Sequence, residues 1–390
     1  MGLLAACAGT VSLPPSPRAE KWVRSVAAGD DPDFRDDLDK SSLVAAIQRS
    51  LKFLEGVPAG TEFPLGELRL KRESLQETLK AFRDYLEKDT SKEPVGDFLR
   101  REFDLYEAVG FSGRRDGLLT AYFEPVLEGS RVRGGEFQYP LYRPPPDLVR
   151  VDLGKFRAPF AGERLAGRLR NGELVPYYSR KEIDQERALE GKGLEIIWLK
   201  DPVDLFFLHV QGSGRILLRD GSSLRVGYAA SNGRPYRSIG RLLQEEGKIR
   251  EEEMSLSALT EYLRNHPEEQ PRVLNYNESY VFFRIVDDGP LGSLDQVLTP
   301  GRSVATDPRL YPPGALAYLV SPKPGLGAAE SSRVPEPIER FVLNQDSGGA
   351  IRGSGRVDLF WGSGENAGRT AGKIKQPVRL FFLIKKGPPS

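Results

Sequence analysis

The sequence predicts a protein of the α+β or all-β class, in which N-terminal helices precede a larger part that is mainly β. The chain has 390 residues, and at roughly 150 residues per domain this length corresponds to two or three domains. It contains 41 glycines and 30 prolines, a share typical of proteins with many turns and short strands. The elements are expected in the order helices, strands, a mixed middle and strands again, which does not fit a doubly wound parallel sheet.

The composition excludes several kinds of function. Hydrophobic residues make up 39% and charged residues 28%, so the chain can form cores and is neither disordered nor membrane-spanning. Its net charge of +1 provides no overall field for binding nucleic acid. A single cysteine excludes an intramolecular disulfide framework and a cysteine-based zinc site, and two histidines leave little room for a histidine-rich metal site or proton relay. We therefore expect no metal and no cofactor, and carboxylates are the candidates for chemistry.

We interpret residues 1–20 as a truncated lipoprotein signal followed by a spacer. Residues 4–7 read Leu-Ala-Ala-Cys, which resembles a bacterial lipobox, where signal cleavage leaves a lipidated cysteine at the mature N-terminus. The part before Cys7 is shorter than the apolar run of ~7–15 residues in a signal peptide, and an ordinary N-terminal cysteine is the alternative. Because Ala8 rather than Asp follows Cys7, we expect an outer-membrane lipoprotein that faces the periplasm.

Residues 21–116 are expected to form a helical N-terminal region. Apolar residues recur there at spacings of three and four, as they do on the buried face of an amphipathic helix. The three apolar stripes consist of Leu43, Ile47, Leu51 and Leu54; of Leu75, Leu79, Phe82 and Leu86; and of Phe98, Leu99, Phe103 and Tyr106.

Strand-like segments dominate the next part of the chain. The segments rich in β-branched and aromatic residues are 117–126, 137–143, 194–199 and 203–211. Asp220-Gly221 lies between two further strand-like runs, 215–219 and 224–228, and predicts a β-hairpin. His209 lies within a predicted strand, so we interpret it as structural rather than catalytic.

Two helices and a second series of strands are expected after this hairpin. One helix has an apolar face around Ile239, and the next, around Leu259, ends at Asn265 before His266 and Pro267. The Pro- and Gly-rich residues 321–337 are expected to form a loop or the tip of a long hairpin. The later strands are predicted at 280–286, 315–320, 340–343, 357–361 and 378–384.

Two familiar catalytic motifs are absent or incomplete. No serine has glycine two residues before and two residues after it, which excludes a nucleophile elbow. Residues 368–374 approach a phosphate-binding loop, but they have too few residues between the glycines and no hydroxyl after the lysine. Three Gly-Ser-Gly triplets, beginning at Gly212, Gly353 and Gly362, predict places where the backbone approaches a ligand or another strand closely.

Three aspartates stand out in the C-terminal third of the chain. Asp307 precedes a proline, Asp346 begins an Asp-Ser-Gly-Gly run, and Asp358 lies between Val and Leu in a predicted strand near Trp361. Each could simply cap a turn. Aspartate is depleted from strands and costly to bury, however, and an apolar setting would raise the pKa of Asp358. A carboxyl that stays protonated near neutral pH is what a general acid for glycosidic cleavage requires.

The segments around these aspartates carry a resemblance to a known family. Residues 346–353 and 358–362 are similar to the C-terminal block of the membrane-bound lytic murein transglycosylase A family, whose 3D domain is named after three aspartates that match Asp307, Asp346 and Asp358. Residues 120–125 read Thr-Ala-Tyr-Phe-Glu-Pro and resemble the family's Thr-Gly-Tyr-Tyr-Glu-Pro, with Ala121 in place of the usual glycine. The resemblance extends from about residue 117 to 385, and the other matching segments are 137–142, 210–214, 236–240 and 279–283.

The resemblance implies a fold and an activity. The fold would be a double-psi β-barrel formed by about residues 100–130 and 272–386. A second, smaller β-barrel domain would be inserted at about 131–271, with a groove between the two barrels. The groove would bind glycan strands of peptidoglycan. The enzyme would cleave the β-1,4 bond between N-acetylmuramic acid and N-acetylglucosamine without water, closing a 1,6-anhydro ring on the muramic sugar.

The resemblance also implies roles for individual residues. Asp358 would act as the single general acid and then as the base, while Asp346 and Asp307 would orient it within the catalytic group. The residues expected to face the substrate are Thr120, Tyr122, Glu124, Gln211, Gly212, Ser213 and Trp361. The implied partners are peptidoglycan glycan strands and, through a lipid on Cys7, the outer membrane.

Three other interpretations remain open from the residues alone. Asp346-Ser347-Gly348 is similar to the motif of aspartic proteases, but the chain has no second Asp-Ser/Thr-Gly, so only a homodimer could form that site. A non-catalytic module that binds the cell wall is the second alternative. The third places the acid at Glu278, because Glu278-Ser279 resembles the Glu-Ser of goose-lysozyme-like transglycosylases, although Glu278 here leads into a predicted strand.

Overall fold

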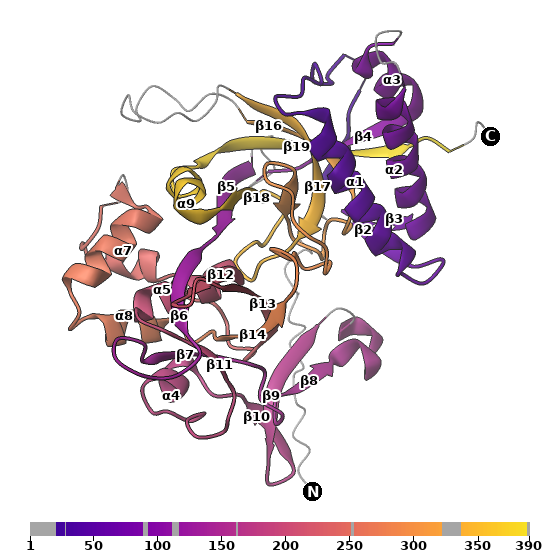
Figure 1. The fold of residues 1–390 in the computed structure, drawn as a ribbon. Helices are drawn as coiled ribbons and strands as arrows, with labels where there is room; N and C mark the ends of the chain where they lie inside the picture. Colours follow the sequence, from indigo (N-terminus) through magenta and orange to yellow (C-terminus); the bar gives the residue numbers. More distant parts are fainter. Residues whose placement is uncertain are drawn as a thin grey trace, which may run out of the picture.

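The two largest sheets of the described chain occupy the upper and lower halves of Figure 1. This computed structural model describes residues 21–387, except 28, 89–92, 111–116, 161–162, 251–252 and 322–336. The signal interpretation for residues 1–20, Cys7 included, and nearly all of the loop predicted at 321–337 therefore lie outside the described residues. The fold is mixed α and β with more strand than helix, as the sequence predicts in outline.

The first sheet combines strands from the two ends of the chain. Its eight strands follow the order β1-β4-β19-β16-β17-β15-β18-β5, and β5 also pairs with β19, so hydrogen bonds link six of the strands in a circuit. The double-psi form expected from the resemblance stays a prediction. The strands are β1 (Val23–Ser25), β4 (Phe103–Ala108), β5 (Gly117–Glu124), β15 (Ser303–Ala305), β16 (Leu316–Ser321), β17 (Ile338–Asp346), β18 (Arg356–Ser363) and β19 (Lys375–Lys385).

The second sheet is built from the middle of the chain. Its order is β14-β13-β12-β6-β11-β7, and the chain enters it directly from the first sheet, since only Pro125 separates β5 from β6. The hairpin predicted at Asp220-Gly221 is confirmed as the antiparallel pair β12 and β13. The strands are β6 (Val126–Ser130), β7 (Tyr139–Tyr142), β11 (Glu195–Leu199), β12 (Ser213–Leu218), β13 (Ser223–Ser231) and β14 (Val281–Val286).

The N-terminal region is only partly helical. The first two apolar stripes are confirmed as the buried faces of α1 (Lys40–Glu55) and α2 (Arg72–Glu87). The third stripe is not one helix, because α3 (Val95–Glu102) ends before Phe103, and both Phe103 and Tyr106 belong to β4. A hairpin of β2 (Glu62–Leu65) and β3 (Leu68–Lys71) lies between α1 and α2, so the prediction of a wholly helical segment is corrected.

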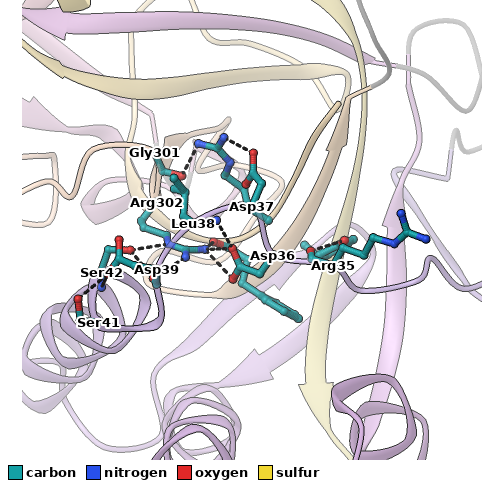
Figure 2. A network of polar contacts seen from close by, with 12 residues as sticks. Arg35, Asp36, Asp37, Leu38, Asp39, Ser41, Ser42, Gly301 and Arg302 are labelled. Atoms are coloured by element: carbon teal, nitrogen blue, oxygen red, sulfur yellow. Dashed lines mark hydrogen bonds and ion pairs between the residues drawn. The ribbon is translucent and has the colours of Figure 1, made fainter. Parts of the chain in front are cut away.

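A buried arginine fastens the N-terminal region to the first sheet. Figure 2 shows the guanidinium of Arg302, whose side chain is fully buried, donating from Nη1 to both carboxylate oxygens of Asp36 at 2.8 and 2.9 Å. Its Nη2 donates to the carbonyl of Asp39, and its Nε donates to the Ser42 hydroxyl at the start of α1. These hydrogen bonds span more than two hundred residues of sequence, so α1 is held at a fixed place beside the sheet.

The segment 203–211 is a helix, α5 (Pro202–Gln211), and not the strand that its apolar run predicts. A short apolar run fits a buried strand and a buried helix equally well, and here the residues at the two ends of the run favour the helix. The Asp201 carboxylate accepts from the Val203 amide, Pro202 lies in the first turn, and Gly212 ends the helix in the left-handed region at φ 77°. His209 therefore lies on a helix, and its side chain is buried, as its structural interpretation requires.

The other helices surround the second sheet or follow β18. The two predicted after the hairpin are confirmed as α6 (Ile239–Glu245) and α7 (Leu256–Asn265). Three helices were not predicted: α4 (Arg180–Asp184), α8 (Gln270–Tyr276) and α9 (Gly364–Ala371). The last of these overlaps the segment that approaches a phosphate loop. No helix in the described part of the chain is long and apolar enough to cross a membrane.

A small third sheet projects from the second. It consists of β8 (Val149–Asp152), β9 (Arg164–Arg170) and β10 (Glu173–Pro176) in the order β10-β9-β8. Two short 3₁₀ turns, η3 (Leu153–Lys155) and η4 (Ala158–Phe160), follow β8. In Figure 1 this sheet lies at the lower edge of the molecule, away from α1 and α2.

Candidate active site

Asp358 lies in the middle of β18, beside Thr120 of β5. The two strands run parallel and the register pairs these two residues directly. The Thr120 hydroxyl donates to Asp358 Oδ1 at 2.6 Å, and Arg356 Nη2 donates in turn to Thr120 Oγ1 at 3.2 Å. Since side chains alternate along a strand, Arg356 and Asp358 share one face of β18. The strand pairing thus produces a chain of three polar groups that ends on one oxygen of the carboxyl.

The surroundings of Asp358 shift its proton affinity. Burial raises the pKa of Asp358 to about 6, against the opposing effects of the Thr120 hydrogen bond and the Arg356 charge, while the negative charge of Asp346 adds to the increase. The residue as a whole is nevertheless partly exposed. A carboxyl with this pKa exchanges its proton near neutral pH, which an ordinary aspartate does not.

Asp346 ends β17, two strands away from Asp358. Ala305 of β15 lies between them, because it pairs with Asp346 on one side and with Asp358 on the other. Tyr122 Oη donates to Asp346 Oδ2 at 2.6 Å, and the backbone amides of Ser293 and Ser347 both donate to Oδ1 at 2.8 Å. Burial raises the pKa of Asp346, although these hydrogen bonds act in the opposite direction.

Asp307 is held in a different way. Its fully buried carboxylate accepts from Arg309 Nη2 at 2.6 Å and from the Gly353 amide at 2.8 Å. Arg352 lies 3.7 Å from its Oδ1. Burial acts to raise the pKa of Asp307, but the hydrogen bonds from Arg309 and Gly353 outweigh it, and the pKa lies below its usual value. Asp307 therefore ties the turn after β15 to the loop before β18 as a charged group.

Some of the residues expected to face a substrate lie around the two carboxyls. Tyr122 is next but one to Thr120 on β5, and its ring lies 5.4 Å from the ring of Phe360. Gln211, the last residue of α5, accepts the Phe123 amide on its Oε1 at 3.2 Å. This is the hydrogen bond that the Gln211 side chain makes among the described residues. Gly212 ends α5, and Ser213, which begins β12, is buried.

Glu124 ends β5 as a buried carboxylate at the junction of the two sheets. Its Oε2 accepts from the Ser363 hydroxyl at 2.6 Å, and its Oε1 lies 3.7 Å from Nε of Arg225 on β13. Neither Oε1 nor that Nε has a hydrogen-bond partner among the described residues. Glu124 thus joins the end of β18 to the second sheet, and it forms no hydrogen bond with the Asp358 carboxyl.

Trp361 does not lie beside Asp358, contrary to the expectation from sequence. Strand alternation turns Trp361 to the opposite face of β18, where it packs against the main core with Val357 and Leu359. The guanidinium of Arg340 lies 5.8 Å from its ring centre, and Arg340 also donates to Asp37 at 2.5 Å. By the same alternation, Phe360 shares the face of Asp358, and its ring lies beside that of Tyr122.

Glu278, the alternative acid, lies in the turn before β14. Its carboxylate forms ion pairs with Arg234 at 3.8 Å and Arg237 at 3.4 Å, both on the second sheet's side of the molecule. A surface depression of about 520 Å³ is also found there, lined by Lys181, Arg272 and Tyr276 among others. None of the three aspartates lines it. These features are separate from the Asp346 and Asp358 pair.

Sequence reasoning missed two groups of the site. Arg356 could have been found from the period of two along the predicted strand 357–361, extended by one residue, which places it on the face of Asp358. The Ser293 amide could not, because nothing in its local sequence indicates that it binds a carboxylate that follows it by more than fifty residues. No cluster of three or more potential metal ligands occurs among the residues that the structure describes.

Two family models match the chain with this fold and site. The MltA specific insert domain matches residues 118–284, which contain the second sheet and its helices. The 3D domain matches residues 302–384, which contain β15 to β19 and all three aspartates. The chain is thus a protein of the class in which a 3D domain is combined with an MltA specific insert.

Curated relatives and solved structures narrow this class to one family. Membrane-bound lytic murein transglycosylase A of Escherichia coli K12 is 33% identical over 284 residues, covering 72% of this chain and 69% of that protein. A membrane-bound lytic murein transglycosylase from Agrobacterium tumefaciens has a TM-score of 0.79 at 30% identity, covering 93% of this chain and 97% of the other. E. coli MltA with bound chitohexaose has a TM-score of 0.65 at 26% identity, covering 89% and 90%. The chain belongs to the membrane-bound lytic murein transglycosylase A family.

Proposed function

We propose that this protein, as a peptidoglycan-cleaving lyase of the lytic transglycosylase type, breaks the β-1,4 bond between N-acetylmuramic acid and N-acetylglucosamine and forms a 1,6-anhydro muramic end. The observation that supports this most directly is the state of Asp358. Its pKa is raised to about 6, one of its oxygens accepts from Thr120, and it remains partly exposed. That combination suits a group that must first donate and then accept a proton at near-neutral pH.

The hydrogen bonds around Thr120 support an assignment of the two carboxyl oxygens. Arg356 has no acceptor atom, so it must donate to Thr120 Oγ1, and the single hydroxyl proton is then directed at Asp358 Oδ1. An Oδ1 that accepts this bond is not the oxygen that carries the acid proton. We infer that Oδ2 carries it and points toward the scissile glycosidic oxygen.

The proposed reaction uses this proton twice. Asp358 Oδ2 donates its proton to the leaving glycosidic oxygen while the bond to the muramic C1 breaks. The same oxygen, now a carboxylate, takes the proton of the C6 hydroxyl as that oxygen bonds to C1 and closes the anhydro ring. Proton and charge return to their starting state, so no second catalytic carboxylate and no water are needed.

The other two aspartates have supporting roles in this proposal. Asp346, with Tyr122 and two backbone amides on its oxygens, contributes a nearby negative charge that helps to keep Asp358 protonated. Asp307 fixes the loop that leads into β18 through Gly353. Tyr122, which binds Asp346, and Gln211, which binds the backbone of β5, are the side chains that we expect to contact sugar.

The larger architecture completes the proposal. We infer that the six-strand circuit of the first sheet is the double-psi barrel of the family, with domain limits near 100–130 plus 272–386, and that residues 131–271 form the inserted domain. The glycan would lie in a groove between the two. An E. coli relative was solved with chitohexaose bound, which supports a glycan ligand. The relatives are named membrane-bound, which supports an anchor, and we place it at a lipid on Cys7 in the outer membrane.

Mass spectrometry of the muropeptides released from purified sacculi tests this proposal. We expect products that are lighter by one water than lysozyme products and that lack a reducing end. Products with a free reducing muramic end would replace the proposal with a hydrolase. Binding to sacculi without release would favour the alternative of a non-catalytic wall-binding module. The protease alternative would need a homodimer in which Asp346, whose Oδ2 accepts from Tyr122 in the single chain, faces the same residue of a second copy.

A further inference from the structure

The third sheet and its 3₁₀ turns, residues 149–160 and 163–176, are called the arm. The arm carries an unusual share of exposed apolar side chains. Five of the fifteen large hydrophobic side chains exposed in the described chain lie here: Phe156, Phe160, Leu165, Leu169 and Leu174. Phe156 is 74% exposed and Leu169 is 66% exposed. Scattered exposed leucines are ordinary, but a contiguous group indicates a binding surface.

The strand register gathers three of these side chains on one face of the arm. Leu169 of β9 pairs directly with Leu174 of β10, and Leu165 pairs with Val151 of β8. Leu165 and Leu169 are four residues apart on β9, so both point to the same side. An antiparallel sheet normally buries its apolar face against a core, whereas this apolar face is exposed.

The opposite face of the arm is packed against the second sheet's part of the molecule. The Arg168 guanidinium lies 4.0 Å from the ring centre of Tyr178. Ala166 lies so close to Gly233 that a side-chain carbon on that glycine would come within 2.8 Å of the Ala166 methyl. The arm is therefore held by one face and presents the other outward. The apolar face is a fixed feature of the fold and not a loosely attached hairpin.

Positive charge accompanies the apolar face. Between Val149 and Pro176 the sequence has six basic residues and three acidic ones. Four exposed cations, Lys155, Arg157, Arg164 and Arg170, form no ion pair with any described residue. Phe156 stands between two of them. Exposed Phe and Leu side chains bordered by unpaired Lys and Arg are the composition of a surface that inserts into a membrane interface and contacts acidic headgroups.

We propose that the arm docks on the surface of a bilayer that contains anionic phospholipid. Phe156, Leu165 and Leu169 would insert at the boundary between headgroups and acyl chains, and the four cations would contact the phosphates. A second copy of the chain is a poorer occupant, because it would bring an equally positive face against the first. Docking would fix how the two sheets are oriented relative to the membrane. This inference does not depend on the chemistry at Asp358.

Vesicle co-sedimentation of the full chain tests the proposal. The Cys7→Ser form is used, so that no lipid anchor contributes. We expect it to sediment with vesicles of mixed phosphatidylcholine and phosphatidylglycerol, to sediment much less with phosphatidylcholine alone, and to dissociate at high salt. The double variant Phe156→Ser/Leu169→Ser should lower the partition coefficient by roughly tenfold or more. The matched control Val132→Ser/Ile285→Ser, two residues that are 73% and 56% exposed elsewhere, should bind like the parent.

The remaining outcomes also decide the question. The double variant Phe156→Ser/Leu169→Ser is called the arm variant. The proposal is overturned if the Cys7→Ser protein does not sediment with anionic vesicles, or if the arm variant sediments with them equally well. A concentration-dependent dimer in lipid-free buffer that the arm variant abolishes overturns it in favour of a self-interface. Activity on soluble glycan strands should be the same in the arm variant and the parent, which shows that the variant is folded. If neither form is active, the proposed function fails while the vesicle result still stands.

Discussion

Removing the charge of Arg356 should move the pH profile of the enzyme toward higher pH. Arg356 Nη2 reaches Asp358 through the Thr120 hydroxyl, with hydrogen bonds of 3.2 and 2.6 Å. The positive charge therefore lies within about 6 Å of Oδ1, where an effective dielectric constant near 20 gives an interaction of about 3 kcal/mol. Arg356 is partly exposed, so solvent screens the charge, and we take about half of this value. Half corresponds to about one pKa unit.

The direction follows from which form of Asp358 the cation favours. Arg356 stabilises the carboxylate and lowers the pKa of Asp358, so Arg356→Met should raise this pKa from about 6 toward about 7. The alkaline limb of kcat/KM reports loss of the acid proton from the free enzyme, and it should shift upward by about one unit. The plateau should also fall, because the Thr120 hydroxyl is no longer directed at Oδ1.

The assay is the initial rate on soluble glycan strands between acidic and mildly alkaline pH. Arg356→Lys keeps the charge and should keep the position of the limb. Arg352→Met is the matched control, since Arg352 is an exposed arginine just before β18 that pairs with Asp307 and not with Asp358. An alkaline limb that stays in place or moves downward in Arg356→Met would refute the assigned relay, even if the overall rate falls.

Five further substitutions test the remaining roles. Asp358→Asn should reduce activity by at least ~10²-fold while binding to sacculi persists, and Glu278→Gln should retain most activity; the reverse pattern would move the acid to Glu278. Thr120→Val should lower the rate by about tenfold and raise the pKa of Asp358, whereas Thr120→Ser should restore both, as kcat/KM profiles would show. Asp307→Asn should lower the free energy of unfolding by about 2 kcal/mol at pH 7 in urea titrations. The pKa of Asp307 is lower in the folded state than in the unfolded state, so its stabilisation is complete above the unfolded-state pKa and should vanish as the pH falls through the folded-state pKa. A loss of unfolding free energy that is equal at pH 7 and in acid would contradict the charged role of Asp307.

Local sequence patterns predicted the elements whose signal lies within the element itself. The spacing of Leu43 and its neighbours identified α1, and Asp220-Gly221 identified the hairpin, because periodicity and turn chemistry are local properties. The run 203–211 carried no such signal, and its helical state was set by the caps at Asp201 and Gly212. These caps were visible in the sequence, and weighing them against the apolar run would have given the helix.

Contacts between distant segments could not be predicted in the same way. The burial of Arg302 depends on Asp36 and the end groups of α1, and nothing near residue 302 indicates that such partners exist. The position of Trp361 was open to sequence reasoning, since an odd offset from Asp358 in one strand puts the two on opposite faces. The resemblance named Thr120, Tyr122 and the aspartates, and the structure adds how their hydrogen bonds are distributed, on which the proposed proton assignment depends.

The geometry at Asp358 is linked to the position of the second sheet through β5. Thr120, which contacts Asp358, lies on the strand that continues through Pro125 into β6, so the two sheets share one extended segment. At the end of that segment Glu124 accepts from Ser363, which ends β18, and its second oxygen faces Arg225 of β13 at 3.7 Å without a hydrogen bond. A shift of the second sheet therefore acts on both strands that carry the site. Thr120, which binds Asp358, and Glu124, which joins the sheets, lie on one face of β5. In the proposed function, a glycan held between the sheets would therefore act on the same strand that orients the Asp358 carboxyl.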